Sequence, residues 1–345
     1  MKNKKWLIEV DYLRTISVLL LVLDHTFIIY TGGWKLPTGI QDVNVYFWLG
    51  NFFMCIMLPL YVFVSGYTYS NQITEAQKCQ SLKKMIIRKF KRLMLPCWIF
   101  SLLHIIIFAE FDRINSLSGV VQLLLTGVAH LWFLPMLFYC FIIAHICRYL
   151  INKKILNRYS LCILTIAASI LTLNVKVTII GGTLYYFTFF YIGHICFIRK
   201  DYVLRYIPPL TILAFFIINF IIVTQIQEQI TFLRSGPLIQ KLCYQWSNHL
   251  IALPMILSGI CIAYQLCCKL MKIKLFQTPI HKIAQYSFGI YIIHHFILEV
   301  LYYHSPMPRI LGSYWLPIIS FTIAFTTSYI LTLSAKKIPV IQNII

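Results

Sequence analysis

The sequence predicts an all-α, polytopic membrane protein: a bundle of about ten transmembrane helices with both termini in the cytoplasm. Hydrophobic residues make up 59% of its 345 residues, and charged residues make up only 12%. The mean hydropathy is +0.77. A soluble globule of this size has no interior large enough for so many apolar side chains, so this composition excludes one.

Ten apolar stretches, most of them near the roughly 20 residues that cross a bilayer, are the expected spans. They are Tyr12–Tyr30, Val45–Ser65, Leu93–Phe111, Leu131–Leu150, Leu161–Leu173, Leu184–Ile198, Ile207–Val223, Leu250–Cys268, Ile283–Tyr303 and Tyr314–Leu333. The first stretch carries charged residues and no cleavage pattern, which indicates a retained span instead of a signal peptide. We expect residues 1–345 to form one membrane-embedded domain with no appended soluble domain.

Lysine and arginine residues follow these spans in a pattern that predicts the orientation. With the N-terminus inside, the cytoplasmic segments hold 23 of the 30 basic residues, the outside segments hold six, and Arg14 lies within the first span. Such a bias supports an even number of spans with both termini inside. It also accounts for most of the net charge of +20, which suits the anionic inner leaflet and calls for no nucleic acid.

The eleven cysteines indicate neither a disulfide framework nor a metal site. Most of them lie within expected spans, and none forms a CxxC pair. We therefore expect small, buried apolar side chains and no metal ion.

The first span carries ionisable residues, which are costly at membrane depth. In a helix, eleven residues end about 20° past three full turns, so Arg14 and His25 share one face, roughly 16 Å apart along the axis. Asp11 precedes Arg14 by three residues and can pair with it. Asp24 points about 100° away from His25 and is not placed to orient the imidazole. This spacing predicts a cationic site near one surface and a deep proton acceptor; the alternative is a packed helix whose polar groups are satisfied by neighbours.

A basic stretch precedes the third span. From Lys83 to Arg92, basic residues alternate with apolar ones, and Leu93-Met94-Leu95-Pro96 follows. This pattern is typical of an interfacial helix with one face on lipid and the other gathering cations. The cations would anchor anionic lipid or hold a phosphorylated ligand.

Two further segments suggest close packing or a backbone break. Phe63-Val64-Ser65-Gly66-Tyr67 ends the second span, and its small residues allow close approach of another helix. Leu117–Ala129 is apolar but too short to cross alone, and Trp132 with Pro135 follows it. This predicts an interfacial or re-entrant start to the fourth span, and the alternative is that Trp132 belongs to an aromatic belt.

The ninth span carries two polar rows. Ser287, Tyr291 and His294 fall on one side at steps of four and three residues, and His295 with Glu299 forms an adjacent i,i+4 pair. Two such rows predict a bundle interior or a water-filled cavity.

Together these motifs resemble those of the acyltransferase 3 family, bacterial integral membrane acyltransferases that modify glycans and related acceptors. The matching pieces are Asp11-Tyr12-Leu13-Arg14 with ten residues before His25, Phe63-Val64-Ser65-Gly66-Tyr67, Arg88–Pro96, Leu131-Trp132-Phe133-Leu134, Phe190-Tyr191-Ile192-Gly193 and Ser287–His294. They occur in family order over nearly the whole chain. One departure concerns the basic stretch, where members often have two arginines three residues apart: Arg92 matches the second, but Lys89 stands at the first. Lysine holds a phosphate as a point charge, without the forked contacts of arginine.

The resemblance implies an O-acetyltransferase-like enzyme of the bacterial inner membrane, which would take an acyl group from acyl-CoA, usually acetyl-CoA, as donor substrate, with no permanently bound cofactor. The catalytic pair would be Arg14 and His25, with His25 acting either as general base or as the first acyl acceptor. The phosphates of coenzyme A need cations, and the candidates for this site are Arg14, Arg88, Lys89, Lys91 and Arg92. The candidates that line the cavity, stabilise the oxyanion or hold the acceptor are Asp11, Ser65, Trp132, Tyr291 and His294.

Two other functions remain open. A polysaccharide exporter or flippase would use Arg14, His25, Tyr291 and His294 to line a conduit, and a non-catalytic membrane component of glycan assembly would tolerate loss of His25. The cationic site near one membrane surface and the deep histidine on the same helix face favour the enzyme. The sequence does not distinguish an exopolysaccharide from a lipopolysaccharide sugar or a lipid-linked precursor as acceptor, nor acetyl from succinyl, and it leaves the oligomeric state open.

Overall fold

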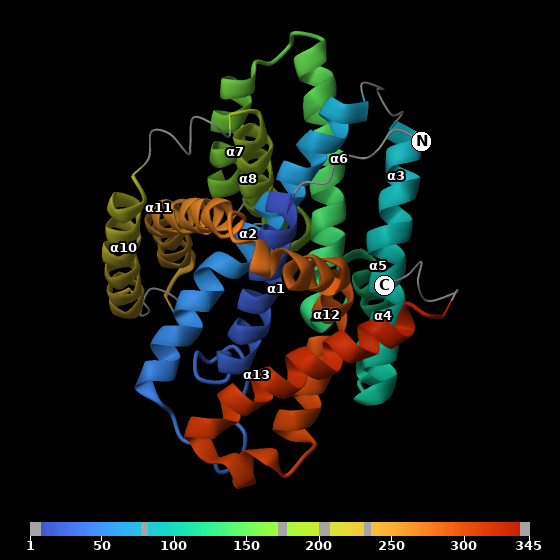
Figure 1. Cartoon of the computed structure of the whole chain (residues 1–345), viewed down its shortest axis with the longest axis vertical. Helices are drawn as coiled ribbons and strands as arrows, with labels where there is room; N and C mark the ends of the chain where they lie inside the picture. The colour runs from blue at the N-terminus through green and yellow to red at the C-terminus, as the bar shows by residue number, and fades with distance from the viewer. Residues whose placement is uncertain (1–7, 77–81, 172–177, 200–207, 231–235, 339–345) are drawn as a thin grey trace. The chain divides into compact units, whose positions relative to one another are not determined.

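The computed structural model describes residues 8–76, 82–171, 178–199, 208–230 and 236–338, and every regular element in these ranges is a helix (Figure 1). The chain divides into two compact units. The first comprises the described parts of Met1–Val64, Asp201–Gln229 and Ile251–Ile338, and the second those of Ser65–Lys200, Ile230–Leu250 and Pro339–Ile345. Each unit is described by itself below, and the expectation of one domain stays a prediction.

The helices of the first unit come from both ends of the chain. They are α1 (Ile8–Phe27), the first part of α2 (Asn44–Ala76), α10 (Pro209–Gln229), the larger part of α11 (Leu238–Leu270), the 3₁₀ helix η5 (Lys274–Phe276), α12 (Gln277–Tyr303) and α13 (Met307–Ala335).

The second unit is built mainly from the middle of the chain. Besides the end of α2 and the start of α11, it contains α3 (Leu82–Lys89), the π-helical turn η1 (Phe90–Met94), α4 (Leu95–Ile107), the 3₁₀ helix η2 (Phe111–Ile114), α5 (Leu117–Thr126), the 3₁₀ helix η3 (Ala129–Trp132), α6 (Phe133–Asn152), α7 (Arg158–Leu171) and α8 (Thr178–Ile198).

Each of the ten expected spans coincides with a helix, but only part of the predicted membrane topology is confirmed. Among the described residues, six helices are long and apolar enough to cross a membrane: Asn44–Ile73, Leu82–Ile107, Ala129–Asn152, Pro209–Ile226, Leu250–Leu270 and Met307–Ala335. The other expected spans fall on α1, α7, α8 and α12. Ten crossings and cytoplasmic termini therefore stay predictions, and residues 172–173 and 207 of the expected spans lie outside the described ranges, as do Lys2, Lys4 and Lys5.

Helices α1 and α12 differ from the six apolar helices because they carry rows of polar residues. They pack against each other, and both pack against α13. Apolar side chains such as Val18, Val22, Ile290 and Leu298 fill this core. The Tyr302 hydroxyl on α12 donates to the carbonyl of Thr26 on α1 at 2.7 Å. Because lipid is as apolar as these side chains, close packing and interhelical hydrogen bonds of this kind hold the helices together.

The close approach expected at Gly66 is confirmed. A Cβ atom at Gly66 on α2 would overlap the backbone carbonyl of Phe190 on α8. Only glycine lets the two backbones come this near, so the small residue serves helix packing in the second unit.

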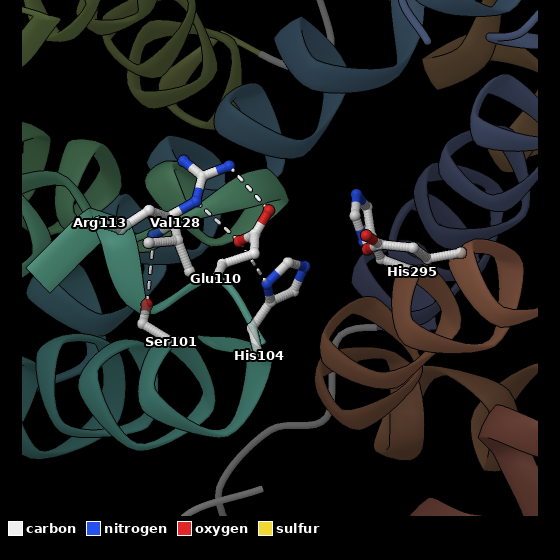
Figure 2. A network of polar contacts seen from close by, with 7 residues as sticks. Ser101, His104, Glu110, Arg113, Val128 and His295 are labelled. Atoms are coloured by element: carbon white, nitrogen blue, oxygen red, sulfur yellow. Dashed lines mark hydrogen bonds and ion pairs between the residues drawn. The ribbon is translucent and has the colours of Figure 1, made fainter. Parts of the chain in front are cut away.

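A backbone break precedes α6, as the pattern suggested, but it lies within the Leu117–Ala129 stretch, and the interfacial or re-entrant placement of this segment stays a prediction. Helix α5 ends at Thr126, Gly127 follows with a φ of 68°, and η3 then leads into α6. The backbone N–H of Val128 donates to the hydroxyl of Ser101 on α4 at 3.2 Å (Figure 2). A break among apolar helices needs such a partner for its freed polar groups, and Ser101 supplies it.

Candidate active site

The deep histidine of the first span is buried on α1 in the first unit. The His25 side chain is 8% exposed, and its Nδ1 lies 2.9 Å from the carbonyl oxygen of Leu21, one turn earlier. A carbonyl oxygen only accepts hydrogen bonds, so Nδ1 carries the proton in this contact. Nε2 of the neutral ring is therefore the nitrogen that can accept a proton.

Asp24 does not orient this ring through a hydrogen bond. Its Oδ2 lies 3.8 Å from Nδ1 of His25, which is beyond hydrogen-bond distance. The helical spacing indicated the same result, since adjacent residues on a helix point in different directions. The carbonyl of Leu21 takes the orienting role instead.

Two histidines of α12 face His25. The ring centroid of His25 lies 5.0 Å from that of His294 and 5.7 Å from that of His295, with edge-to-face geometry in both pairs. His294 is fully buried, and its Nδ1 donates to the carbonyl of Ile290 at 3.0 Å. Both His25 and His294 are thus oriented by their own helices in the same tautomer.

Trp34 covers this histidine cluster, which comprises His25, His294 and His295. Its ring centroid lies 4.7 Å from that of His295 and 6.1 Å from that of His25. Trp34 belongs to the segment after α1, and the Tyr303 hydroxyl at the end of α12 donates to the carbonyl of the next residue, Lys35, at 2.7 Å. Sequence reasoning missed Trp34, since nothing in the local pattern shows that this segment folds back over α12.

The i,i+4 pair predicted on α12 forms beside the cluster. Nδ1 of His295 lies 3.6 Å from Oε2 of Glu299. The sequence indicated this pair but did not indicate that His295 lies against His25, because that contact depends on how α1 and α12 pack.

A row of polar rings leads from the histidine cluster toward Arg14. The Tyr291 ring on α12 lies 6.4 Å from His294, and Tyr61 on α2 lies 6.3 Å from Tyr291, measured between centroids. Tyr61 and Asp11 both interact electrostatically with the half-buried Arg14. The first unit therefore connects the two residues that the sequence placed on one face of α1 through side chains of two other helices.

Asp11 has a partner that the sequence did not suggest. Its Oδ2 lies 2.6 Å from Nδ1 of His281, near the start of α12, and Nε2 of His281 contacts the side-chain amide of Gln285 at 2.5 Å. A neutral His281 satisfies both contacts by donating from Nδ1 and accepting at Nε2. Asp11 thus ties α1 to α12 in addition to its electrostatic contact with Arg14.

The basic stretch lies in the second unit, and its four candidate residues do not face the same way. Lys89 is 7% exposed, and its Nζ lies 3.3 Å from the centroid of the Phe141 ring on α6, a cation–π contact. Arg88, Lys91 and Arg92 are exposed. Lys89 follows Met85, the other buried residue of α3, by four residues, so the lysine that stands in place of an arginine lies on the inward face of α3 while its basic neighbours face outward.

Two of the residues predicted to line the cavity, stabilise the oxyanion or hold the acceptor also belong to the second unit. Ser65 on α2 is half-buried, and its carbonyl accepts a hydrogen bond from the Thr68 hydroxyl at 3.0 Å. Trp132 at the end of η3 is 36% exposed, and its ring lies 5.8 Å from that of Tyr186 on α8. Joint action of these residues, or of the basic stretch, with Arg14 and His25 stays a prediction because the units are described separately.

A polar network that sequence reasoning missed holds the α4–α5 connection of the second unit (Figure 2). Arg113 donates to both carboxylate oxygens of Glu110, at 2.7 Å and 3.0 Å, and Nδ1 of His104 lies 3.3 Å from Oε2 of Glu110. Partial burial acts to raise the pKa of Glu110, but the hydrogen bonds and positive charge of Arg113, with His104, outweigh it and lower this pKa.

The histidine cluster is suited to proton transfer next to an uncharged or weakly acidic group. Imidazole is the side chain whose ordinary pKa lies nearest to neutral pH, and His25 presents an acceptor nitrogen held in place by its own helix. The edge-to-face rings of Trp34, His294 and His295 restrict the ring further. Such an arrangement fits a general base or a nucleophile.

A family model for an acyltransferase domain matches residues 7–336 of the chain, which is nearly its whole length. No curated protein sequence and no solved structure matches the chain.

Proposed function

Because the chain belongs to the acyltransferase 3 family, we propose that it is a membrane O-acetyltransferase that moves an acetyl group from acetyl-CoA to a hydroxyl of a glycan or glycan precursor. The observation that supports this most directly is the buried His25, whose Nδ1 is held by Leu21 and whose Nε2 is left as proton acceptor. The proposed location is the inner membrane of a bacterium, as a multi-pass protein.

In the direct route, Nε2 of His25 takes the proton of the acceptor hydroxyl while its oxygen attacks the carbonyl carbon of the thioester. The carbon–sulfur bond then breaks, and the sulfur of coenzyme A leaves with the proton that the imidazolium returns. In the covalent route, Nε2 attacks the thioester first and the hydroxyl then takes the acyl group from the ring. Both routes use the same nitrogen.

The developing oxyanion needs a hydrogen-bond donor, and the tautomer of His294 bears on which residue supplies it. Nδ1 of His294 already donates to the carbonyl of Ile290, so Nε2 of the neutral ring is an acceptor. His294 would donate there only as an imidazolium. The Tyr291 hydroxyl carries a proton in its ordinary state, which makes Tyr291 the better donor and His294 a second proton acceptor.

The donor's phosphates would meet the cationic residues. Arg14 lies in the first unit next to Tyr61, and Arg88, Lys91 and Arg92 form the exposed part of the basic stretch. Lys89 packs on the ring of Phe141, so we propose that it positions this stretch and contributes charge without a forked phosphate contact.

The test is mass spectrometry of cell glycans with and without the protein, and with His25→Ala. An added acetyl mass that is present with the intact protein and absent with His25→Ala is the expected result. His145→Ala is the matched control, since His145 on α6 belongs to the second unit and lies outside the cluster. Glycans with the same masses in all strains would contradict the proposal, and loss of surface glycan without any change in acyl mass would point to export.

A second measurement separates the two routes. Purified full-length protein is incubated with radiolabelled acetyl-CoA in the absence of an acceptor. Label that stays on the protein and is absent from His25→Ala would support the covalent route, whereas label that appears only on added acceptor would support direct transfer.

A further inference from the structure

The second unit contains a cavity whose described lining residues include none of the histidine cluster. Its volume is about 220 Å³, and it lies among the end of α2, the end of α6, the start of α7 and the end of α8. We propose that this cavity binds a phosphate ester that carries an apolar chain. This inference does not rest on the proposed acetyl transfer.

The charge of the cavity favours an anion. Arg148 on α6 and Arg158 at the start of α7 both line it, and among the described residues that line it none is an aspartate or a glutamate. The positive charges of both arginines act on His194, which lines the cavity from α8. Two guanidinium groups in one lining create a site whose natural complement is an oxyanion, and arginine matches phosphate geometry well.

His194 supplies a second observation. Its Nδ1 is buried, and within the described part of the chain this atom has no hydrogen-bond partner. A buried polar atom of this kind costs free energy unless a partner is present. The ring lines the cavity, and a turn of the ring would let a phosphate oxygen accept a hydrogen bond from this nitrogen once the ring carries its proton there.

Specific hydrogen bonds hold the start of α7, which carries Arg158 on the cavity wall. The Tyr191 hydroxyl on α8 donates to the carbonyl of Arg158 at 3.1 Å. The side chain of Asn157 accepts from the N–H of Ser160 at 2.7 Å and so caps the start of α7. These contacts fix the backbone that carries Arg158 against α8, which is what a site with a defined geometry requires.

The remaining walls are largely apolar. Ile73, Ala144, Ile151, Phe190 and Ile198 all line the cavity. Such walls gain nothing from a bare inorganic ion, but they suit a chain attached to the phosphate. The ligand is therefore an amphipathic phosphate ester, and its two possible sources are a membrane phospholipid and a soluble phosphate ester such as coenzyme A, whose arm is partly apolar.

The experiment measures binding to the purified full-length protein in detergent by calorimetry. The probes are dioctanoyl phosphatidic acid, dioctanoylglycerol with the same chains but no phosphate, inorganic phosphate, and coenzyme A. We expect phosphatidic acid to bind, while dioctanoylglycerol and inorganic phosphate bind at least about tenfold more weakly, as loss of charge-assisted contacts or of chain burial implies. Equal binding of dioctanoylglycerol would overturn the proposal.

The variants locate the site. Arg148→Gln with Arg158→Gln should weaken binding of phosphatidic acid about tenfold or more, and the pair Arg148→Lys with Arg158→Lys should recover part of it. The matched control is Lys153→Gln with Lys154→Gln, which removes the same charge from the same connection, where both residues are exposed and neither lines the cavity. An equal loss in the control pair would show general surface attraction and overturn the proposal.

Two readouts complete the design. Competition by coenzyme A for the bound phosphatidic acid, lost in the arginine variants, would identify a soluble ester as an occupant, whereas its absence would identify the lipid; both support the site. If the double arginine variant fails to fold, His194→Phe gives an independent test, because it keeps an aromatic ring but removes both nitrogens. Unchanged affinity in His194→Phe would remove the histidine contact on which the site depends.

Discussion

Two histidines on apolar helices, His25 in the first unit and His194 in the second, meet very different neighbours. His25 faces two other imidazoles and an indole, with the Asp24 carboxylate 3.8 Å from its Nδ1. The positive charges of Arg158 and Arg148 act on His194. The neighbours of a histidine therefore indicate its role: neutral or acidic neighbours favour a proton acceptor, and cationic neighbours favour contact with a bound anion.

The same comparison extends to hydrogen bonds. Nδ1 of His25 is satisfied by the carbonyl of Leu21, whereas Nδ1 of His194 has no partner within the described residues. His25 thus needs no ligand to hold its ring, which suits a group that must be ready before substrate arrives. Under the proposal above, a bound phosphate would supply the partner that Nδ1 of His194 lacks within the described residues.

The largest expected effect is on the rate of acyl transfer. In His25→Asn, the side-chain amide can still donate to the carbonyl of Leu21, but no basic nitrogen remains. We expect transfer to fall by about 10² to 10⁴-fold, as is typical for loss of a general base, and further if His25 is the nucleophile. Release of free coenzyme A from acetyl-CoA and an acceptor measures this.

The control for that prediction is the other histidine. His194→Asn should leave the rate at saturating acetyl-CoA within about twofold, since the cavity of the second unit holds none of the reacting groups in the proposed chemistry. Equal losses in His25→Asn and His194→Asn would mean that the two histidines do not have separate roles.

The next effect concerns packing in the second unit. Gly66→Ala places a Cβ atom on the backbone carbonyl of Phe190, and overpacking of this kind costs about 1–3 kcal/mol of stability. Gly182→Ala on α8 is the matched control, because a Cβ atom there meets nothing within 4 Å. Thermal unfolding in detergent measures both.

Gly66→Ala should also weaken binding of phosphatidic acid, because α2 and α8 both line the cavity of the second unit. If Gly66→Ala and Gly182→Ala unfold at the same temperature and bind equally well, the close approach of the two helices does not hold the cavity open.

A third effect tests the role of Arg14. Arg14→Gln removes the charge while keeping a polar side chain, so we expect KM for acetyl-CoA to rise about tenfold with a smaller change in kcat, as loss of one charged contact to a phosphate implies. Steady-state kinetics at several donor concentrations measure this. An unchanged KM with a large drop in kcat would place Arg14 in the chemistry of the cluster and not at the donor.

The smallest effect is a shift with pH at the Glu110 network. Arg113 lowers the pKa of Glu110, so the pairing contributes stability above the ordinary glutamate range, and this contribution is lost as the pH falls through the lowered pKa. Arg113→Ala should therefore lower the unfolding temperature at neutral pH and have little effect in strong acid. The control is Asp112→Asn at the exposed neighbouring carboxylate. If Arg113→Ala lowered the unfolding temperature equally at neutral and at acid pH, the assignment would be contradicted.

Much of the candidate site could be predicted because its spacing is local. The common face of Arg14 and His25 follows from the pitch of one helix, and so does the His295–Glu299 pair. The close approach at Gly66 follows from a residue without a side chain, which lets another backbone come near. The family model, which covers residues 7–336, supports the same reading of the motifs.

The remaining contacts could not be predicted because they join segments far apart in the chain. His281 with Asp11, Trp34 against His295, and His194 beneath Arg148 and Arg158 each depend on how separate helices pack. The burial of Lys89 is another such case, since the Phe141 ring that it packs on belongs to α6.

By itself, the sequence determined the class of protein, the helices and the polar face of α1, because hydropathy and helical pitch depend only on neighbouring residues. The packing of separate helices decided which rings surround His25, and which histidine lies near arginines. The physical reason is that a helix sets the direction of a side chain, whereas the charge and polarity that this side chain meets come from other helices.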